Sequence, residues 1–396
     1  MASAPDAAWT VGSLLKTTAA YFAEKGVDSA RLDAELLLAR ALGCDRIHLY
    51  TGHDRMLTPA ELDAYRALVR RRGAREPLAY LIGEKEFYGR AFGVTRAVLI
   101  PRPETEGLVD AALAWRDARG AGALRVLDLG TGSGCLAVTI AATWPDAAVT
   151  ATDCSAAALA VARANADRHG VADRIAFREG DLFAALPADA APFDLVLCNP
   201  PYVDRDDDRT APDVKRYEPP EALYADEGGR AILRRLAEGL GAHLAAEGLA
   251  LVEIGADQAE AAAALFRAAG FAAVTVLTDL AGRARIVRIA RAAPAPDAPP
   301  AEYTYEPVPE QARLLEAEAA AARGEYTVEP IAEDPADVDA AGDSALEAAA
   351  GPVYDAPSPA PAAGAAALER LLDAYAEGGD DDDDPEAVDP DAAPET

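Results

Sequence analysis

The sequence predicts an α/β protein in which a helical region precedes a doubly wound, mostly parallel sheet. Apolar strand-like segments alternate with helical segments between residues 124 and 289, which is typical of a parallel sheet covered by helices on both faces. Residues 278–283 are too few for a parallel crossover, so the last two strands should pair antiparallel. Seven strands are expected, at residues 124–129, 148–152, 175–178, 193–198, 249–254, 273–277 and 284–289, with helices at 155–169, 229–244 and 257–269.

Residues 1–83 are expected to form an all-helical domain. Gly43 follows a segment with helical periodicity and suits a helix C-terminus. Thr58 and Glu61 have the spacing of a capping box, so a further helix should begin after Thr58 and end near Arg72. A basic cluster at residues 70–75 complements the dipole at the end of that helix, and contact with RNA or an acidic partner is the less favoured interpretation.

Residues 84–102 are expected to form a β-hairpin that links the helical domain to the sheet domain. Apolar residues there follow a period of two around Gly89 and Gly93. The sheet domain then spans residues 103–291 and contains all seven expected strands. In such sheets, ligands bind outside the carboxyl ends of the parallel strands, so the residues that follow each strand are the candidate site residues.

Most of the negative charge lies in the last 105 residues. The whole chain has a net charge of −30, but residues 292–396 carry 27 acidic residues and three arginines, and residues 1–291 have a net charge of only −6. The final segment also contains 15 of the 28 prolines, so it is predicted to be a disordered acidic tail with short helices at 310–322 and 365–376. A solubilising extension is favoured over an acidic interaction arm. The charge excludes a broadly basic protein, so stable nucleic-acid binding is not expected.

The sequence gives no sign of a membrane or metal-binding protein. It has no apolar run of about 18 residues and no basic start followed by an apolar stretch, so neither a membrane span nor a secretion signal is expected. The four cysteines lie far apart without a CxxC pair, which argues against a disulfide framework and a metal site. A monomer in the reducing cytoplasm is the resulting expectation.

A glycine-rich turn, DLGTGSG, follows the first expected strand and opens a helix. Its GxGxG spacing differs from the GxGxxG of dinucleotide sites, and the lysine of a phosphate-binding loop is missing. Asp128, two residues before the first glycine, suits a cationic ligand, so it would face the sulfonium and amino group of S-adenosylmethionine; the alternative is a purely structural turn. The remaining cofactor-binding candidates of this turn are Gly130, Thr131, Gly132, Ser133 and Gly134.

Two further acids follow the next two strands. Asp153 is placed to accept both ribose hydroxyls of an adenosine ligand, although it could instead cap the helix that begins near Ser155. Asp181 could accept from the adenine amino group, and Leu182 could pack on the adenine ring. Together with the glycine-rich turn, these residues predict an adenosine-containing cofactor.

The segment Asn199-Pro200-Pro201-Tyr202 indicates the reaction, because it follows a strongly apolar strand. Two prolines fix the backbone and remove its N–H donors, which leaves the Asn199 side-chain oxygen and the Pro200 carbonyl as acceptors for the two hydrogens of a planar NH₂ group. The Tyr202 ring could stack on that plane. An amide nitrogen is a poor nucleophile, so holding both hydrogens orients it toward a methyl donor and stabilises the positive charge that develops. Asn199, Pro200 and Tyr202 are therefore the predicted catalytic residues, and all four residues are predicted to bind the substrate.

Over about residues 10–291 the sequence resembles the protein glutamine methyltransferases that act on peptide-chain release factors. The resemblance rests on PLAYLIG (77–83), LIPRPETE (99–106), DLGTGSGCLA (128–137), FDLVLCNPPYV (193–203), YEP with AL (217–223) and EIG with Gln258 (253–258). It implies a class I, Rossmann-like methyltransferase fold and S-adenosylmethionine bound by residues 130–134, Asp153, Leu182 and Asn199. It also implies that residues 199–202 hold a glutamine amide, and that the helical domain docks a release factor whose Gly-Gly-Gln motif is the substrate.

Two features depart from the family pattern. Leu182 stands where the family often has tryptophan, and residues 224–229 (YADEGG) replace the usual GGxDG loop. Three other interpretations remain: a glutamine methyltransferase of a ribosomal protein, a nucleic-acid amino-methyltransferase, and a non-catalytic binding protein. The acidic run at residues 204–208 disfavours nucleic acid, and the intact motifs disfavour the non-catalytic protein.

Overall fold

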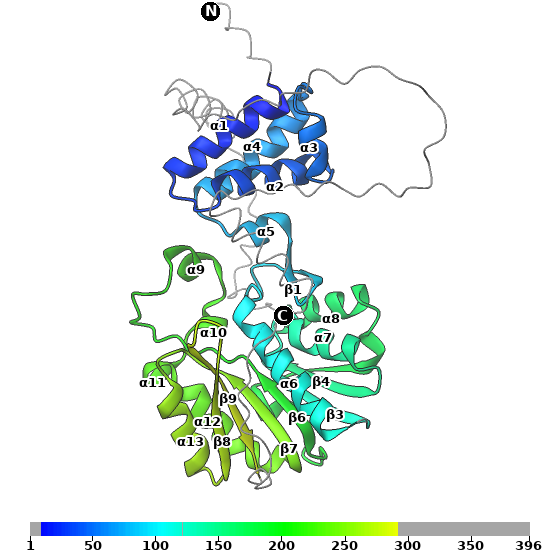
Figure 1. Ribbon diagram of the computed structural model, residues 1–396, viewed down its shortest axis with the longest axis vertical. Coiled ribbons are helices and arrows are strands. Elements are labelled where there is room, and N and C mark those ends of the chain that lie inside the picture. The colour runs from blue at the N-terminus through cyan, green and yellow to red at the C-terminus, as the bar shows by residue number, and fades with distance from the viewer. Residues whose placement is uncertain (1–8, 121, 292–396) are drawn as a thin grey trace, which may run out of the picture. The chain divides into compact units, whose positions relative to one another are not determined.

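The computed structural model describes residues 9–120 and 122–291 (Figure 1), and the predicted acidic tail lies outside the described residues. The predicted α/β fold is confirmed. Seven strands form one sheet in the order β5-β4-β3-β6-β7-β9-β8, in which β3 to β7 run parallel to one another and β9 is antiparallel to both β7 and β8. The strands are β3 (Leu124–Leu129), β4 (Ala147–Asp153), β5 (Ile175–Glu179), β6 (Phe193–Cys198), β7 (Leu244–Glu253), β8 (Ala273–Thr278) and β9 (Ala284–Ala290).

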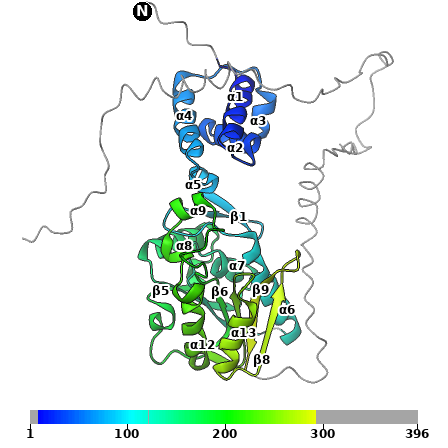
Figure 2. The same cartoon turned by 90° about the vertical axis from the view of Figure 1, so that its left-hand side faces the viewer.

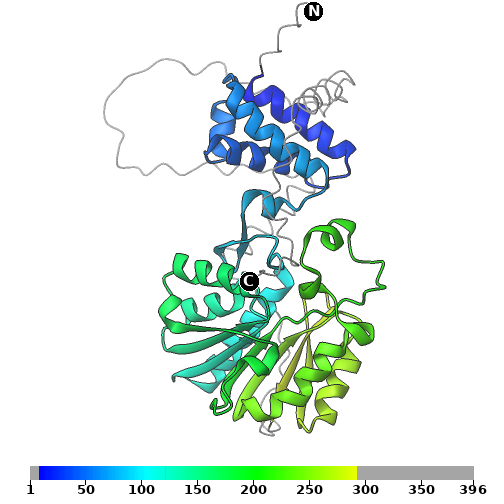
Figure 3. The ribbon, with the colours of Figure 1, turned by 180° about the vertical axis from the view of Figure 1, so that it is seen from behind.

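Helices cover both faces of the sheet (Figures 2 and 3). Successive strand residues point to opposite faces, so Val126 packs in one apolar cluster with residues of α6 and α7, while Leu127 packs in a second cluster with residues of α12 and α13. Almost continuous apolar strands, such as β3 and β6, follow from burial on both faces. The main helices are α6 (Glu106–Arg119), α7 (Cys135–Thr143), α8 (Ala156–Arg168), α12 (Ala231–His243) and α13 (Ala259–Ala268).

Residues 11–82 form helices with a separate apolar core. The expected capping box is present, since the Thr58 hydroxyl accepts from the Glu61 amide and the Glu61 carboxylate accepts from the Thr58 amide at 2.9 Å. Gly43 ends α2 in the left-handed conformation, as its position predicted. The helices are α1 (Val11–Glu24), α2 (Ala30–Leu42), α3 (Ile47–Thr51), α4 (Pro59–Gly73) and α5 (Leu78–Ile82).

The hairpin after this region consists of β1 (Glu84–Phe87) and β2 (Arg90–Gly93), which pair antiparallel. Its two turn residues, Tyr88 and Gly89, both have positive φ, which matches the twist of a tight two-residue hairpin. From Pro103 the chain enters a short 3-10 helix, η1 (Pro103–Thr105), that leads into α6.

The largest difference from the expected strands is in β7, which begins at Leu244 and not at residue 249. The preceding helix ends at His243, so the chain passes from α12 into the strand without a loop. Leu244 already pairs with Phe193, and an irregularity in the β6–β7 register accommodates the extra residues before Leu249. Sequence periodicity alone could not detect this start, because residues 245–247 alternate poorly and are partly exposed.

Candidate active site

The glycine-rich turn joins β3 to α7 and exposes its backbone to a pocket. Gly130 and Gly132 have φ of 70° and 53°, and among the described residues no atom lies within 4 Å of the position that a Cβ would take at either. A Cβ at Gly134, in contrast, would meet Ala162 of α8 at 3.1 Å. The first two glycines therefore leave room for a ligand against the main chain, while the third allows close helix packing.

Asp128 lies behind this turn. Its Oδ2 accepts from the Thr131 hydroxyl at 2.6 Å and from the Ala137 amide at 3.2 Å. Burial raises the pKa of the Asp128 carboxyl to about 7. Within residues 9–120 and 122–291, Asp128 Oδ1 has no hydrogen-bond partner, which is a costly state for a buried carboxylate and fits a site that a cationic group completes.

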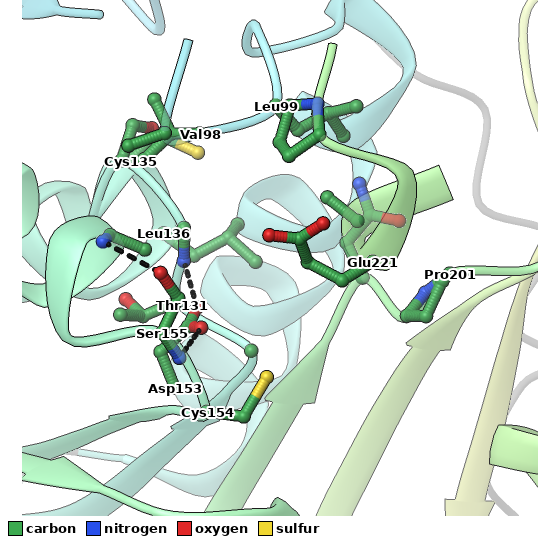
Figure 4. A pocket seen from close by; sticks show the side chains of 18 of the residues that line it. Val98, Leu99, Thr131, Cys135, Leu136, Asp153, Cys154, Ser155, Pro201 and Glu221 are labelled. Carbon is green, nitrogen blue, oxygen red and sulfur yellow. Dashed lines mark hydrogen bonds between the residues drawn. The ribbon is translucent and has the colours of Figure 1, made fainter. Parts of the chain in front are cut away.

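Asp153 follows β4 and contacts the turn directly. Its Oδ2 accepts from the Gly132 amide and its Oδ1 from the Ser155 amide, both at 2.9 Å (Figure 4). The N-cap of α8 is Ser155, whose hydroxyl accepts from Ala158, so Asp153 is not itself that cap. The Asp153 carboxylate lines the pocket while it fixes the glycine-rich turn.

Most of the predicted site residues meet around one pocket. Arg102, Thr105, Cys154 and Glu221 also line it, and Figure 4 shows the Glu221 carboxylate directed into the pocket from the side of Pro201. Asp128, Gly134, Pro200 and Tyr202 are not among the lining residues, and Tyr202 instead lines a neighbouring polar cavity. The predicted residues that line the pocket are Gly130, Thr131, Gly132, Ser133, Asp153, Asp181, Leu182, Asn199 and Pro201.

Asp181 and Leu182 lie at one end of the lining. Leu182 has a positive φ of 49° and begins a short 3-10 helix, and Asp181 Oδ2 accepts from Arg235 at 2.7 Å. This ion pair with Arg235 is solvent-exposed on both sides and leaves Asp181 Oδ1 as an acceptor. The predicted contact of these two residues with an adenine ring stays a prediction.

Asn199 stands at the carboxyl end of β6, and its side chain is held in one orientation. Its Nδ2 donates to the Thr105 hydroxyl oxygen at 3.0 Å, which leaves Oδ1 as the acceptor of this side chain. The Tyr202 hydroxyl donates to Glu253 Oε1 at 3.3 Å. This hydrogen bond holds the Tyr202 ring at its hydroxyl end. The predicted stacking of the ring on a substrate amide stays a prediction.

Three residues that position the site were found in family motifs without a role from sequence reasoning. Glu218, buried, accepts from the Ile100 amide at 3.1 Å and from Arg102 at 2.6 Å, and so joins the YEP and LIPRPETE segments across the pocket wall. Gln258 donates to the Tyr202 carbonyl at 3.0 Å and holds the NPPY segment. Glu253 is the third residue, and burial raises the pKa of its carboxyl to about 7.

The loop that departs from the family pattern forms a single turn, α11 (Asp226–Gly229). Glu227 and Gly228 have left-handed conformations, and the Gly229 carbonyl accepts from Gln258 at 3.3 Å. The loop is therefore fastened to the same side chain that holds the Tyr202 carbonyl.

Comparison with known proteins identifies the family. The protein-family model described as PrmC N-terminal domain matches residues 13–83, and the protein-family model described as Methyltransferase small domain matches residues 117–214. A release factor glutamine methyltransferase from Geobacter sulfurreducens is 42% identical over 280 residues, which cover 70% of this chain and 96% of the relative. The chain belongs to the release factor glutamine methyltransferase family.

A second member of the family, from Chlorobaculum tepidum, is 51% identical over 226 residues, or 56% of this chain and 77% of the relative. Among solved structures, an RNA methyltransferase from Salinibacter ruber in complex with S-adenosyl-L-homocysteine has 20% identity and a TM-score of 0.31, covering 52% of this chain and all of that one. The family matches and the curated relatives confirm the predicted family, and this protein is a methyltransferase whose methyl donor is S-adenosylmethionine.

The described residues contain neither a membrane-spanning helix nor a cluster of potential metal ligands. In this part of the chain, no helix is long and apolar enough to cross a membrane. Nor do residues 9–120 and 122–291 hold a group of three or more His, Cys, Asp or Glu side chains arranged for a metal ion.

Proposed function

We propose that this methyltransferase modifies the side-chain nitrogen of the glutamine in the Gly-Gly-Gln motif of peptide-chain release factors. Family membership supports the substrate class, and one contact carries the proposal for the chemistry. Because Asn199 Nδ2 is engaged by Thr105, Asn199 Oδ1 is the group left to accept from a substrate NH₂. A carboxamide needs this arrangement, since its nitrogen carries two donors and no usable acceptor.

The proposed cofactor-binding residues fit S-adenosylmethionine. The open backbone at Gly130 and Gly132 gives room for it, and directly behind the turn the buried Asp128 Oδ1, which has no hydrogen-bond partner within the described residues, adds negative charge that favours a cationic group. The Asp153 carboxylate keeps lone pairs for ribose hydroxyls beyond its two backbone contacts. When bound, this cofactor supplies an electrophilic methyl group.

The residues of the chain act on the substrate amide. The Asn199 oxygen and the Pro200 carbonyl accept the two N–H groups, which fixes the nitrogen and its lone pair in a direction that the carboxamide resonance otherwise disfavours. As the new C–N bond forms, positive charge grows on the nitrogen and both acceptors bind more strongly. The methyl group's bond to sulfur breaks as the C–N bond forms, which leaves S-adenosylhomocysteine, and one N–H proton then passes to solvent water as the methylated amide becomes neutral. A dedicated base is not required for this step.

Labelling identifies the substrate directly. Purified protein is incubated with cell extract and methyl-labelled S-adenosylmethionine, and the labelled material is analysed by peptide mass spectrometry. The proposal predicts label on the glutamine of a Gly-Gly-Gln peptide. Label on a glutamine of a ribosomal protein would show that a ribosomal protein, and not a release factor, is the substrate. Label in RNA or DNA would refute the proposal. The acids that follow Tyr202, among them Asp204 and Asp206, disfavour a nucleic-acid substrate.

Cofactor affinity is expected to rise with pH through the Asp128 carboxyl. Its raised pKa of about 7 means that the group is neutral below this pH and charged above it, and only the carboxylate attracts a cation. Between pH 6 and 8 the ionised fraction rises from about one tenth to about nine tenths, so calorimetry should show up to a tenfold gain in affinity. The Asp128→Asn variant should lose this dependence. A pH-dependent gain that persists in the variant would assign it to another group.

Removal of residues 292–396 is expected to leave methyl transfer within about threefold. Among the described residues, those that line the pocket lie between Ala97 and Ile232, and the last strand ends at Ala290. The test compares kcat and KM of the full chain with those of a chain that ends at Arg291. A loss of more than about tenfold in the shortened chain would make the acidic segment part of the function.

A further inference from the structure

Three side chains behind Asn199 form a hydrogen-bonded network. The Thr105 hydroxyl accepts from Asn199 Nδ2 at 3.0 Å, and the Tyr202 hydroxyl donates to Glu253 Oε1 at 3.3 Å. Burial raises the pKa of the Glu253 carboxyl, while hydrogen bonds from Thr105 and Tyr202 lower it. Thr105 is 2% exposed and Glu253 is 1% exposed, so water does not compete for these contacts. The network comes from three separate parts of the chain: η1, the NPPY segment and the end of β7.

The sheet register brings these parts together. β6 and β7 are parallel neighbours, and Cys198 pairs with Val252, so the next residues along each strand, Asn199 and Glu253, emerge side by side at the carboxyl edge. Thr105 reaches the same edge from the start of α6. Thr105 lies 94 positions before Asn199 and Glu253 lies 54 positions after it, so no motif in the sequence links the three residues.

The direction of the donors follows from the hydrogen bond between Asn199 and Thr105. Asn199 Nδ2 donates to the Thr105 oxygen, so the Thr105 O–H is left to donate to Glu253, whose side chain keeps an acceptor oxygen whether its carboxyl is neutral or ionised. This arrangement places Asn199 Nδ2 toward Thr105 and Oδ1 on the other side. If Thr105 instead pointed its hydrogen at Asn199, the carboxamide would turn over and present NH₂ groups to the substrate NH₂.

We infer that Thr105 and Glu253 are positioning residues that fix the Asn199 carboxamide with Oδ1 toward the substrate amide. The inference rests on the proposed function for the identity of the substrate, but the orientation itself is a property of the free protein. Charged neighbours of Glu253 are Glu104, which disfavours its ionisation, and Arg285, which favours it. Neither is among the groups that hydrogen-bond to Asn199 in the described part of the chain.

The chain allows a direct measurement of this orientation because it contains only two asparagines, Asn165 and Asn199. Protein labelled with ¹⁵N at asparagine side chains should give two NH₂ signal pairs. Asn165 is the internal reference, since its Nδ2 donates to the carbonyls of Gly93 and Ser133 at 2.9 and 2.8 Å, away from the network. The Asn199→Ala variant assigns the second pair.

Thr105→Val removes the hydroxyl while it keeps the shape of the side chain. It is expected to shift the Asn199 pair, to leave the Asn165 pair in place and to lower kcat for release-factor methylation about 10- to 100-fold, with KM and cofactor affinity within about threefold. Thr105→Ser should restore both the signal and kcat. Glu253→Gln should also shift the pair, because its new NH₂ group can reverse the hydrogen bond to Thr105. The control is Thr139→Val, since Thr139 is fully buried and its hydroxyl has no partner within the described residues.

The outcomes separate the two proposals. An Asn199 pair that Thr105→Val does not move, or a kcat that stays at the wild-type value while wild type methylates release factor, would overturn the positioning role. A shifted pair in a protein that does not methylate release factor would keep the positioning role and remove the proposed substrate. If Thr105→Ser restores neither the position of the Asn199 signal pair nor kcat, the hydroxyl of residue 105 is not the positioning group.

Discussion

Replacing Asn199 with alanine is expected to abolish measurable methyl transfer while cofactor affinity falls by no more than about threefold. The variant removes the side-chain acceptor whose partner, the substrate NH₂, gains positive charge only as the new bond forms. Loss of one such preorganised group typically costs about 10²- to 10³-fold in kcat. The cofactor keeps its contacts with the glycine-rich turn and Asp153, which Asn199 does not touch through a hydrogen bond in the described structure.

The measurements are single-turnover methyl transfer to release factor and calorimetric titration with S-adenosylmethionine. A thermal melt of the variant checks that it is folded, because Asn199 follows a buried strand. Retained turnover together with a large loss of cofactor affinity would place Asn199 in cofactor binding and not in catalysis. Equal losses of both would indicate damage to the pocket as a whole.

Replacing Gly229 with alanine is expected to lower methyl transfer at least about 100-fold and to destabilise the fold by about 2–4 kcal/mol. A Cβ at this position would lie 2.0 Å from the Tyr202 carbonyl oxygen and 2.7 Å from Gln258 Nε2. The φ of 77° adds strain for any other residue. The backbone of Tyr202 must then move, and with it the preceding residues of the NPPY segment, including the Pro200 carbonyl and Asn199.

Gly228→Ala is the matched control. Gly228 has nearly the same φ, 67°, but the nearest atom to its Cβ would be 3.5 Å away, an ordinary contact. Its cost should be backbone strain alone, about 1–2 kcal/mol, with kcat within about threefold of wild type. Chemical denaturation and steady-state kinetics of both variants test this. Equal effects of the two substitutions would show that strain in α11, and not the contact with Tyr202, governs the site.

Much of the fold was predictable because local sequence patterns, such as apolar periodicity and capping residues, indicate where strands and helices form. β3 and β6 were predicted at their observed residues, since strands buried on both faces are apolar throughout. The capping box at Thr58 was also predictable, because its two partners lie only three residues apart. The early start of β7 was not, because pairing with Phe193 and not local periodicity defines it.

The site divides in the same way. By itself, the sequence determined which segments follow the strands, namely the glycine-rich turn, Asp153 and the NPPY segment, and their residue types predicted an adenosine cofactor and an NH₂ substrate. Only the tertiary structure decided which way the Asn199 carboxamide faces, since its Nδ2 donates to Thr105, 94 residues away. It also decided that Gln258 fastens Tyr202 and that Glu218 joins two distant segments. The physical reason is range: a side chain's type and spacing report its local backbone, whereas the direction of a buried hydrogen bond depends on strand order and register, which bring distant residues together.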